Sequence, residues 1–158
     1  MTITKLLISN NCDVVTIPGG MMPRAALGYL VAPLLYIMDQ LDQVDPLFEI
    51  HLKNLIRSLK YYRTILSDHT SKENFSFSTA QQILSATPLI YAESGITEAV
   101  ANRWRTQLAE NSKILASTHM LPELNHNEIV SWQNSKDKAG KYGILWLIDS
   151  SMHTRNKK

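Results

Sequence analysis

Hydrophobic positions recur along this chain in two rhythms. Over several stretches they step by three or four residues, which is the spacing of one helix face, and the step is clearest at Ile96, Val100, Trp104 and Leu108. Elsewhere short apolar runs stand between Gly, Pro or Ser, which is typical of strands. The pattern predicts helices at 2–10, 23–41, 45–66, 79–86, 96–114 and 126–132, and strands at 13–17, 87–91, 117–120 and 142–149. Helices that alternate with strands indicate an α/β layered domain with a short, mainly parallel sheet.

The longest apolar run lies in the second predicted helix, from Ala25 to Met38. It is hydrophobic almost all round, so we expect this helix to be buried in the core. The run is shorter than the roughly 20 residues that a spanning helix needs. The N-terminal residues also lack the long apolar core of a secretory signal. These features predict a cytoplasmic protein with no membrane partner.

Composition narrows the class of partner. The chain has 158 residues, of which 44% are hydrophobic and 19% charged, and its formal net charge is +2. This is the balance of a globular domain with a core, and the charge is too low to predict binding to nucleic acid. The single cysteine, Cys12, cannot form an internal disulfide, which indicates a reducing compartment. We expect Cys12 to be a small buried side chain.

Arg24 stands at the start of the apolar helix, after the break at Pro18-Gly19-Gly20. The positive end of the helix dipole makes this a poor place for a purely structural arginine. The free N–H groups of a helix start bind anions, and a cation there would add to that attraction. Two interpretations stay open, namely an arginine that meets an anionic ligand and a surface arginine paired with a carboxylate.

Glu110 follows an apolar stripe near the end of the helix predicted at 96–114. A carboxylate near the negative end of a helix dipole holds its proton more tightly. That property suits a general base that works near neutral pH. The alternative is a solvated glutamate that pairs with Lys113, three residues further on.

The segment Leu121–Trp132 places two carboxylates, a histidine and two asparagines within six consecutive residues. Asn125 and Glu128 fit a helix cap with its reciprocal partner. His126 would then occupy the first helical position, where it could point into a cleft. The spacing is not His-Glu-x-x-His and no second histidine lies within a helix turn, so no metal site is predicted. His126 is either a structural or a catalytic histidine.

Three motifs, taken together and in this order, resemble the bifunctional phosphoglucose/phosphomannose isomerases of archaea and bacteria. They are Pro-Arg-Ala-Ala-Leu-Gly-Tyr at 23–29, Glu-Asn-Ser-Lys at 110–113 and Leu-Pro-Glu-Leu-Asn-His-Asn-Glu-Ile-Val-Ser-Trp at 121–132. The third motif is long and specific, and the resemblance extends over nearly the whole chain. It implies a sugar-isomerase (SIS) fold of the flavodoxin-like type. Residues 1–20 would be the end of a first SIS domain with its linker, and residues 21–158 an incomplete C-terminal SIS isomerase domain.

The resemblance also implies a reaction and a role for each candidate residue. Family members convert glucose 6-phosphate and mannose 6-phosphate to fructose 6-phosphate through an enediol(ate), and no cofactor is expected. Glu110 would be the base that moves a proton between C1 and C2. His126 would help to open the sugar ring in the site of the partner subunit of a homodimer. Arg24 would lie near the enediolate oxygens, where an anionic intermediate needs a fixed cation.

Two parts of the family pattern have no counterpart in this sequence. One is the set of Ser/Thr-rich loops of the first SIS domain, which hold the phosphate, and the other is a lysine of the C-terminal region. Two functions therefore stay open: the C-terminal part of a hexose 6-phosphate isomerase, or a truncated, catalytically inactive SIS-like fragment or interaction module. Binding of a remote phosphate helps to orient the sugar over the base. We therefore expect little or no isomerase activity from the isolated chain.

Overall fold

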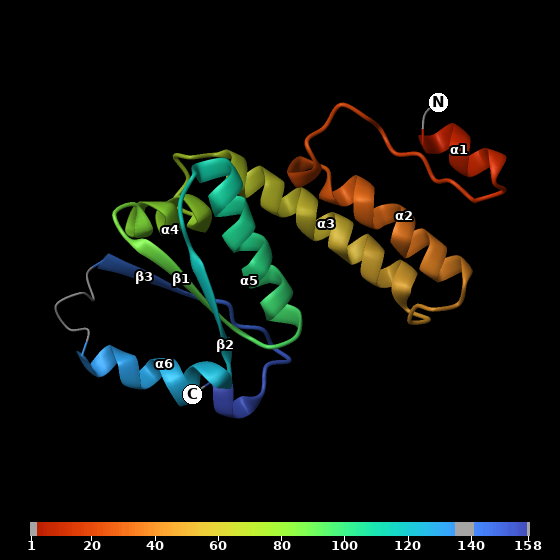
Figure 1. Cartoon of the computed structure of the whole chain (residues 1–158). Coiled ribbons are helices and arrows are strands. Elements are labelled where there is room, and N and C mark those ends of the chain that lie inside the picture. Colours follow the sequence, from red (N-terminus) through yellow and green to blue (C-terminus); the bar gives the residue numbers. More distant parts are fainter. Residues whose placement is uncertain (1–2, 135–140, 158) are drawn as a thin grey trace. The chain divides into compact units, whose positions relative to one another are not determined.

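A computed structural model describes residues 3–134 and 141–157 of the chain. The chain divides into two compact units, Met1–Tyr61 and Tyr62–Lys158, and each is described here by itself. The first unit is helical, and the second holds a sheet with helices on both faces (Figure 1). The predicted division at residues 20 and 21 stays a prediction.

The first unit consists of helices and connecting segments. It contains α1 (Ile3–Ser9), the short η1 turn (Pro23–Ala25), α2 (Leu27–Gln40) and most of α3 (Phe48–Ser67). The helices predicted at 2–10, 23–41 and 45–66 are therefore confirmed. The strand predicted at 13–17 is wrong, because these residues adopt no regular structure. A strand needs a neighbour for its backbone hydrogen bonds, and none of the described residues of this unit forms one.

The predicted burial of α2 is also wrong. None of its residues is buried, and large apolar side chains such as Leu34 and Tyr36 are 59% and 63% exposed. The physical reason is that an open groove of about 940 Å³ separates α2 from α3, lined largely by apolar side chains of both helices. The apolar run thus faces a groove rather than a filled core. Cys12, which was expected to be buried, is exposed as well.

The second unit alternates helices and strands. Its elements, in order, are the end of α3, then α4 (Phe75–Ile83), β1 (Thr87–Glu93), α5 (Ile96–Gln107), η2 (Leu108–Ser112), β2 (Ser117–Leu121), α6 (Glu123–Ser131), η3 (Trp132–Asn134), β3 (Tyr142–Trp146) and η5 (Thr154–Lys157). The strands predicted from residues 87, 117 and 142 are confirmed. The helix predicted at 79–86 begins earlier, because Asn74 caps α4: its Oδ1 accepts the Phe77 N–H at 3.0 Å.

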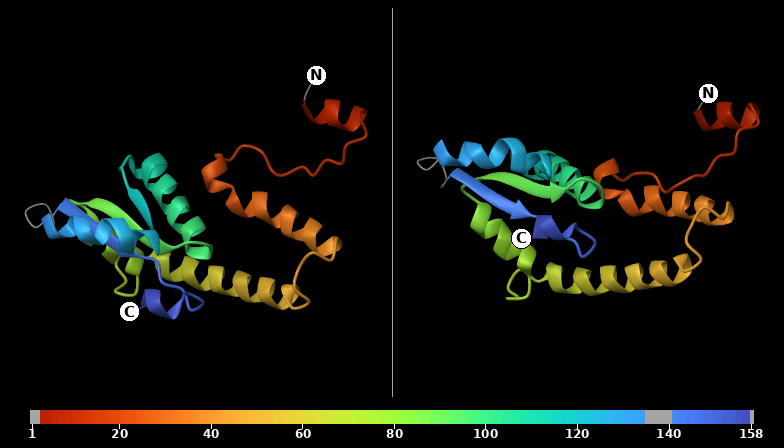
Figure 2. Two further views of the ribbon diagram at one scale, coloured as in Figure 1. Left: turned by 60° about the horizontal axis from the view of Figure 1, so that its bottom comes forward. Right: turned by 90° about the horizontal axis from the view of Figure 1, so that it is seen from below.

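The sheet has three strands in the order β2-β1-β3, and both pairs are parallel. This confirms the predicted α/β class with a short parallel sheet flanked by helices. Side chains of a strand alternate between the two faces, and β1 shows this directly. Leu89 and Tyr91 pack with Leu121 and Leu124 on the α6 face, whereas Ile90 and Ala92 pack with α5 on the other. The right-hand view of Figure 2 shows α4 and α6 on opposite sides of the strands.

The central strand β1 carries most of the core. Its residues from Pro88 to Ala92 are all buried, whereas Ile144 and Trp146 of the edge strand β3 are 44% and 47% exposed. Gly143 allows α4 to approach β3, because a Cβ atom there would lie 2.8 Å from Cγ2 of Ile83. The buried residues of this unit are therefore concentrated in β1 and in the side chains that pack against it.

Candidate functional site

Glu110 lies on η2, a π-helical turn that ends α5. The chain leaves this turn through Lys113, which adopts the left-handed conformation (φ 59°) and whose N–H bonds back to the carbonyl of Leu108. Lys113 Nζ donates to the backbone carbonyl of Glu110 at 2.6 Å. The predicted helix 96–114 thus changes type at Leu108. Single π turns within helices are frequent at functional sites.

A cavity of about 360 Å³ lies beside this turn, and its lining mixes apolar side chains with hydroxyl and amide groups. The lining residues are Phe75, Ser76, Thr79, Ala80, Ile83, Trp104, Gln107, Leu108, Asn111, Ser112 and Leu145. Glu110 is not among them, although residues on both sides of it are. The cavity is therefore a neighbour of Glu110 and is not assigned to a ligand.

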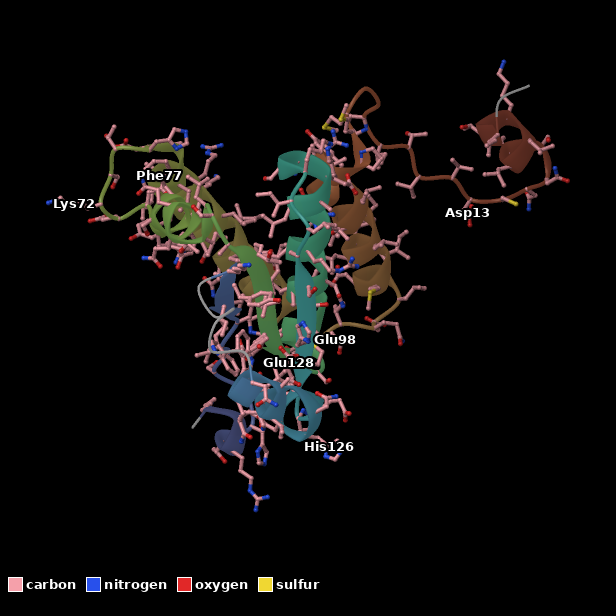
Figure 3. All side chains as sticks on the ribbon, turned by 60° about the vertical axis from the view of Figure 1, so that its left-hand side comes forward. Asp13, Lys72, Phe77, Glu98, His126 and Glu128 are labelled. Atoms are coloured by element: carbon pink, nitrogen blue, oxygen red, sulfur yellow. The ribbon has the colours of Figure 1, made fainter. Side chains whose placement is uncertain are left out.

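His126 lies in the first half of α6 and is exposed. Pro122 occupies the N-cap position, so the predicted cap at Asn125 is wrong and α6 begins three residues earlier than expected. The predicted reciprocal partner, Glu128, makes other contacts, described below. Glu128 and His126 are two positions apart, which corresponds to about 200° around a helix. Figure 3 shows Glu128 on the sheet side of α6 and His126 on its outer side.

Glu110 and His126 lie at opposite ends of the sheet. The strands β1 and β2 are parallel, so α5 must run back from the carboxyl end of β1 to the amino end of β2. Glu110 closes this return helix at the amino end, whereas His126 follows the carboxyl end of β2. The five residues of β2 alone separate these ends by roughly 15 Å. One chain therefore does not bring the two residues into one site.

Arg24 belongs to the first unit and is half-buried. It lies in the η1 turn, and α2 begins three residues later, at Leu27. Arg24 was predicted to lie in the first turn of the long apolar helix. It lies instead in a short 3-10 turn that immediately precedes this helix.

A polar cluster, which we call the Tyr91 network, connects α6 to the sheet. The Tyr91 hydroxyl donates to Glu128 Oε1 at 2.5 Å and accepts a hydrogen bond from Trp132 Nε1 at 3.1 Å. His119 Nδ1 contacts the second carboxylate oxygen of Glu128. Tyr91 is only 3% exposed. The side chains of Glu128 and His119 are 17% and 32% exposed, so the network is buried at Tyr91 and partly exposed at His119.

The hydrogen bonds of this network assign the protons. Burial, and then the hydrogen bond to Glu128, raise the pKa of Tyr91 from 10 to about 12. The hydroxyl is therefore a donor at neutral pH, and Oε1 of Glu128 accepts its hydrogen bond. His119 Nδ1 faces the second carboxylate oxygen of Glu128, and in a neutral ring with a hydrogen on Nδ1 the other nitrogen, Nε2, is an acceptor. Nε2 is buried and has no partner among the described residues, which costs less for an acceptor than for an N–H donor.

Tyr91, His119 and Trp132 were not predicted as a group from the sequence. Two signals point to them in retrospect. Tyr91 and His119 are direct neighbours in the parallel register of β1 and β2, so their side chains share a face. The positions 124, 128 and 132 step by four, which predicts one helix face, and that face meets β1 and β2. The first signal is readable only when the register of the strands is known, and the second does not by itself say which strands the helix face meets.

The carboxyl end of β1 is covered by the last residues of the second unit. Glu93, the last residue of β1, accepts the N–H of His153 at 3.1 Å and Nδ2 of Asn156 at 2.6 Å. Met152 beside them is 3% exposed. Ligands of open α/β sheets bind outside the carboxyl ends of the strands. In this chain Glu93 and the segment 149–157 occupy that place over β1.

Two further findings concern metals and membranes. Among residues 3–134 and 141–157, no three His, Cys, Asp or Glu side chains are grouped so that they could hold a metal ion. Within the same ranges no helix combines the length and the apolar character needed to cross a bilayer.

Comparison with known proteins identifies the family. Residues 72–158 match the family described as the bacterial phospho-glucose isomerase C-terminal SIS domain. This matched segment is the second unit almost in full. The fold, a short parallel sheet between helices, is consistent with a SIS domain. The chain therefore belongs to the bacterial phosphoglucose isomerase family, through its C-terminal SIS domain.

Curated relatives agree with this assignment. The chain is 37% identical, over 91% of its length, to the bifunctional phosphoglucose/phosphomannose isomerase of Caldicellulosiruptor bescii, of which it covers 42%. It is 31% identical, over 92% of its length, to the enzyme of the same name from Aquifex aeolicus, of which it covers 41%. The chain thus spans about two fifths of the length of these relatives. No solved structure matches the chain.

Proposed function

We propose that this chain is the C-terminal part of an aldose–ketose isomerase of hexose 6-phosphates. It would take part in the conversion of glucose 6-phosphate and mannose 6-phosphate to fructose 6-phosphate, through an enediol(ate). Two observations support the proposal. The relatives carry the names of both activities, and the chain belongs to a phosphoglucose isomerase family. A metabolic role of this kind fits the cytoplasm.

In this mechanism Glu110 is the general base. It removes the proton from C2 of the open-chain aldose, and the electron pair of that bond forms the C1–C2 double bond while O1 becomes an oxyanion. Glu110 then returns the proton to C1 while the O2 proton passes to the O1 oxyanion, so that O1 becomes a hydroxyl and C2 the ketose carbonyl. His126 assists ring opening beforehand by proton transfer. Arg24 supplies the fixed positive charge that the enediolate oxygens need.

The observation that carries the proposal is the separation of Glu110 and His126. A site shared between two subunits of a homodimer requires that each chain present these residues at different places, as this one does. The face of α6 that holds His126 also carries Ile129 and Val130, three and four positions further on. Both are 55% exposed. Exposed apolar side chains beside a polar one are typical of a surface that meets another protein.

The test is a coupled isomerase assay of the purified chain with both aldose phosphates, over a wide range of protein concentration. We expect slow turnover that disappears in Glu110→Gln, since the amide cannot accept a proton. A rate near the typical enzyme value of about 10 per second would contradict the expectation that the isolated chain is weak. Turnover that is equal in wild type and Glu110→Gln would refute the role of Glu110. No turnover at any concentration would favour the alternative, a catalytically inactive SIS-like fragment or interaction module.

Mixing two inactive variants tests the shared site. Glu110→Gln and His126→Ala each remove one half of every site, so each is expected to be inactive alone. In a mixed dimer one of the two sites receives Glu110 from one chain and His126 from the other. Random pairing should therefore restore about a quarter of the wild-type rate. Recovery that is absent, while each variant still folds and dimerises, would place both residues in a site of one chain and refute the shared arrangement.

A further inference from the structure

The Tyr91 network has no role in the proposed chemistry, yet it brings a carboxylate, an imidazole and a largely buried tyrosine together within the second unit. It joins three elements: β1 through Tyr91, β2 through His119, and α6 through Glu128. Trp132, just after α6, completes it. A surface helix can be held by apolar contacts alone, and α6 has them in Leu124. The polar contacts must therefore add something that apolar packing does not supply.

Directional bonds fix the rotation of α6 about its axis. Apolar packing tolerates a sliding or turning helix, whereas a carboxylate that accepts two hydrogen bonds from two strands has one favourable orientation. Glu128 is held at both oxygens, by Tyr91 at 2.5 Å and by His119. His126 is about 200° around the helix from Glu128. Any turn of α6 that released Glu128 would swing His126 away from its outward direction.

We infer that Glu128, held by Tyr91 and His119, is a positioning residue that sets the direction in which α6 presents His126. The inference rests on the proposed function only in its last step, the use of His126 in catalysis. Two features support it. The inward positions Leu124 and Glu128 stand one helical turn apart, so both side chains face the sheet. The raised pKa of Tyr91, about 12, keeps its hydroxyl a donor to Glu128 over the whole neutral range.

The first test compares Glu128→Gln with Glu123→Gln. Glu123 lies on the same helix, and among the described residues its side chain accepts only from Asn127 of α6 itself, at 3.2 Å, so it is a matched control for loss of one charge. In Glu128→Gln one acceptor oxygen is replaced by an NH2 group, so the side chain can no longer accept from both Tyr91 and His119; when its oxygen stays on the Tyr91 hydroxyl, the amide nitrogen faces His119 Nδ1, which then acts as an acceptor. The proton of His119 moves to Nε2. Nitrogen-15 NMR distinguishes the two tautomers, and a purely space-filling role for Glu128 would not move this signature.

The second measurement follows the helix and the histidine. In Glu128→Gln, amide hydrogen exchange of α6 should rise by about tenfold or more, since a buried bond to an ionised group is lost. Carbon-13 relaxation of the labelled His126 ring should show lower order. Glu123→Gln should change neither. If Glu128→Gln leaves α6 and His126 no different from Glu123→Gln, the inference is wrong.

Isomerase activity gives a separate test of the positioning role of Glu128. Where wild-type chain turns over, Glu128→Gln should lower kcat by about tenfold with little change in KM, because the substrate still binds but ring opening meets a misdirected histidine. An unchanged kcat, together with a loosened helix, would overturn the positioning role. A wild-type chain with no turnover would count against the proposed function alone, and the NMR and exchange results would still decide whether Glu128 directs His126.

Discussion

Removal of one hydroxyl group, by Tyr91→Phe, measures how much the Tyr91 network stabilises the second unit. The hydroxyl donates to the Glu128 carboxylate and accepts from Trp132, and the ring stays in place in the variant. A hydrogen bond to an ionised group contributes about 1.5–3 kcal/mol. The loss of the Trp132 bond adds less, because that indole is only partly buried and water can reach it. We therefore expect Tyr91→Phe to lower the free energy of unfolding by about 2–3 kcal/mol.

Tryptophan fluorescence in urea is a suitable assay. All three tryptophans, Trp104, Trp132 and Trp146, belong to the second unit, so the signal reports on that unit. With an m-value of about 1.5 kcal/mol per M, the midpoint should fall by about 1–2 M. Tyr142→Phe is the control, because Tyr142 is 38% exposed and packs edge-on against Trp132. A loss below about 0.5 kcal/mol in Tyr91→Phe, the size of an ordinary surface substitution, would refute the reasoning.

Tyr91→Phe should also change how the free energy of unfolding depends on pH in alkali. Tyr91 ionises at about 12 in the folded protein, against about 10 for a free tyrosine. The folded state therefore holds this proton longer than the unfolded state, and the stability that Tyr91 supplies is complete below pH 10 and is lost as the pH rises towards 12. The two pKa values differ by about two units, so this part of the loss is at most about 3 kcal/mol. Tyr91→Phe should lack it, and the wild type and variant should therefore converge above pH 11.

Two further variants test the contacts of α4. Gly143→Ala should destabilise the second unit by about 1–3 kcal/mol through overpacking, since the new Cβ would meet Cγ2 of Ile83 at 2.8 Å. Adding Ile83→Ala should recover part of this loss in the same urea assay. A Gly143→Ala variant of unchanged stability would contradict the close approach of α4 to β3. Asn74→Asp keeps a good capping oxygen but replaces the amide that donates to the carbonyls of Leu66 and Asp68, at 3.1 and 2.9 Å. It should cost about 2 kcal/mol or more, whereas a stabilising effect would mean that capping dominates at this buried site.

The sequence predicted the second unit well because its elements are specified locally. The apolar run at 87–91 and the four-residue step from Ile96 give β1 and α5 without knowledge of what they pack against. The order of the strands and the face that each residue takes depend on tertiary pairing, so they could not be obtained in this way. That is why Glu128 was assigned to a helix cap: the local spacing fits a cap, but Tyr91 and His119 offer it better donors from the sheet.

In the first unit the sequence predicted the helices but not which of their residues are buried. Its helices were predicted from local pattern and are present, yet the predicted burial of α2 failed. An apolar run indicates that a helix avoids water, but it does not say which surface covers it. Arg24 shows the same limit for a functional residue. A sequence motif made it a candidate, but only the structure shows that it lies in the η1 turn. The roles of Glu110, His126 and Arg24 stay proposals that rest on family membership and placement.

The π turn at Leu108–Ser112 has a consequence for how this helix end can change. A π turn holds one residue more than an α turn between hydrogen-bonded partners, so it is equivalent to a single-residue insertion in an otherwise regular helix. Deletion of Ala109 would restore α geometry, and the residues after it would then be displaced by about 100° and 1.5 Å. Glu110 would point to another side of the helix with its chemistry unchanged. The direction of the Glu110 side chain thus depends on the number of residues in the turn that precedes it.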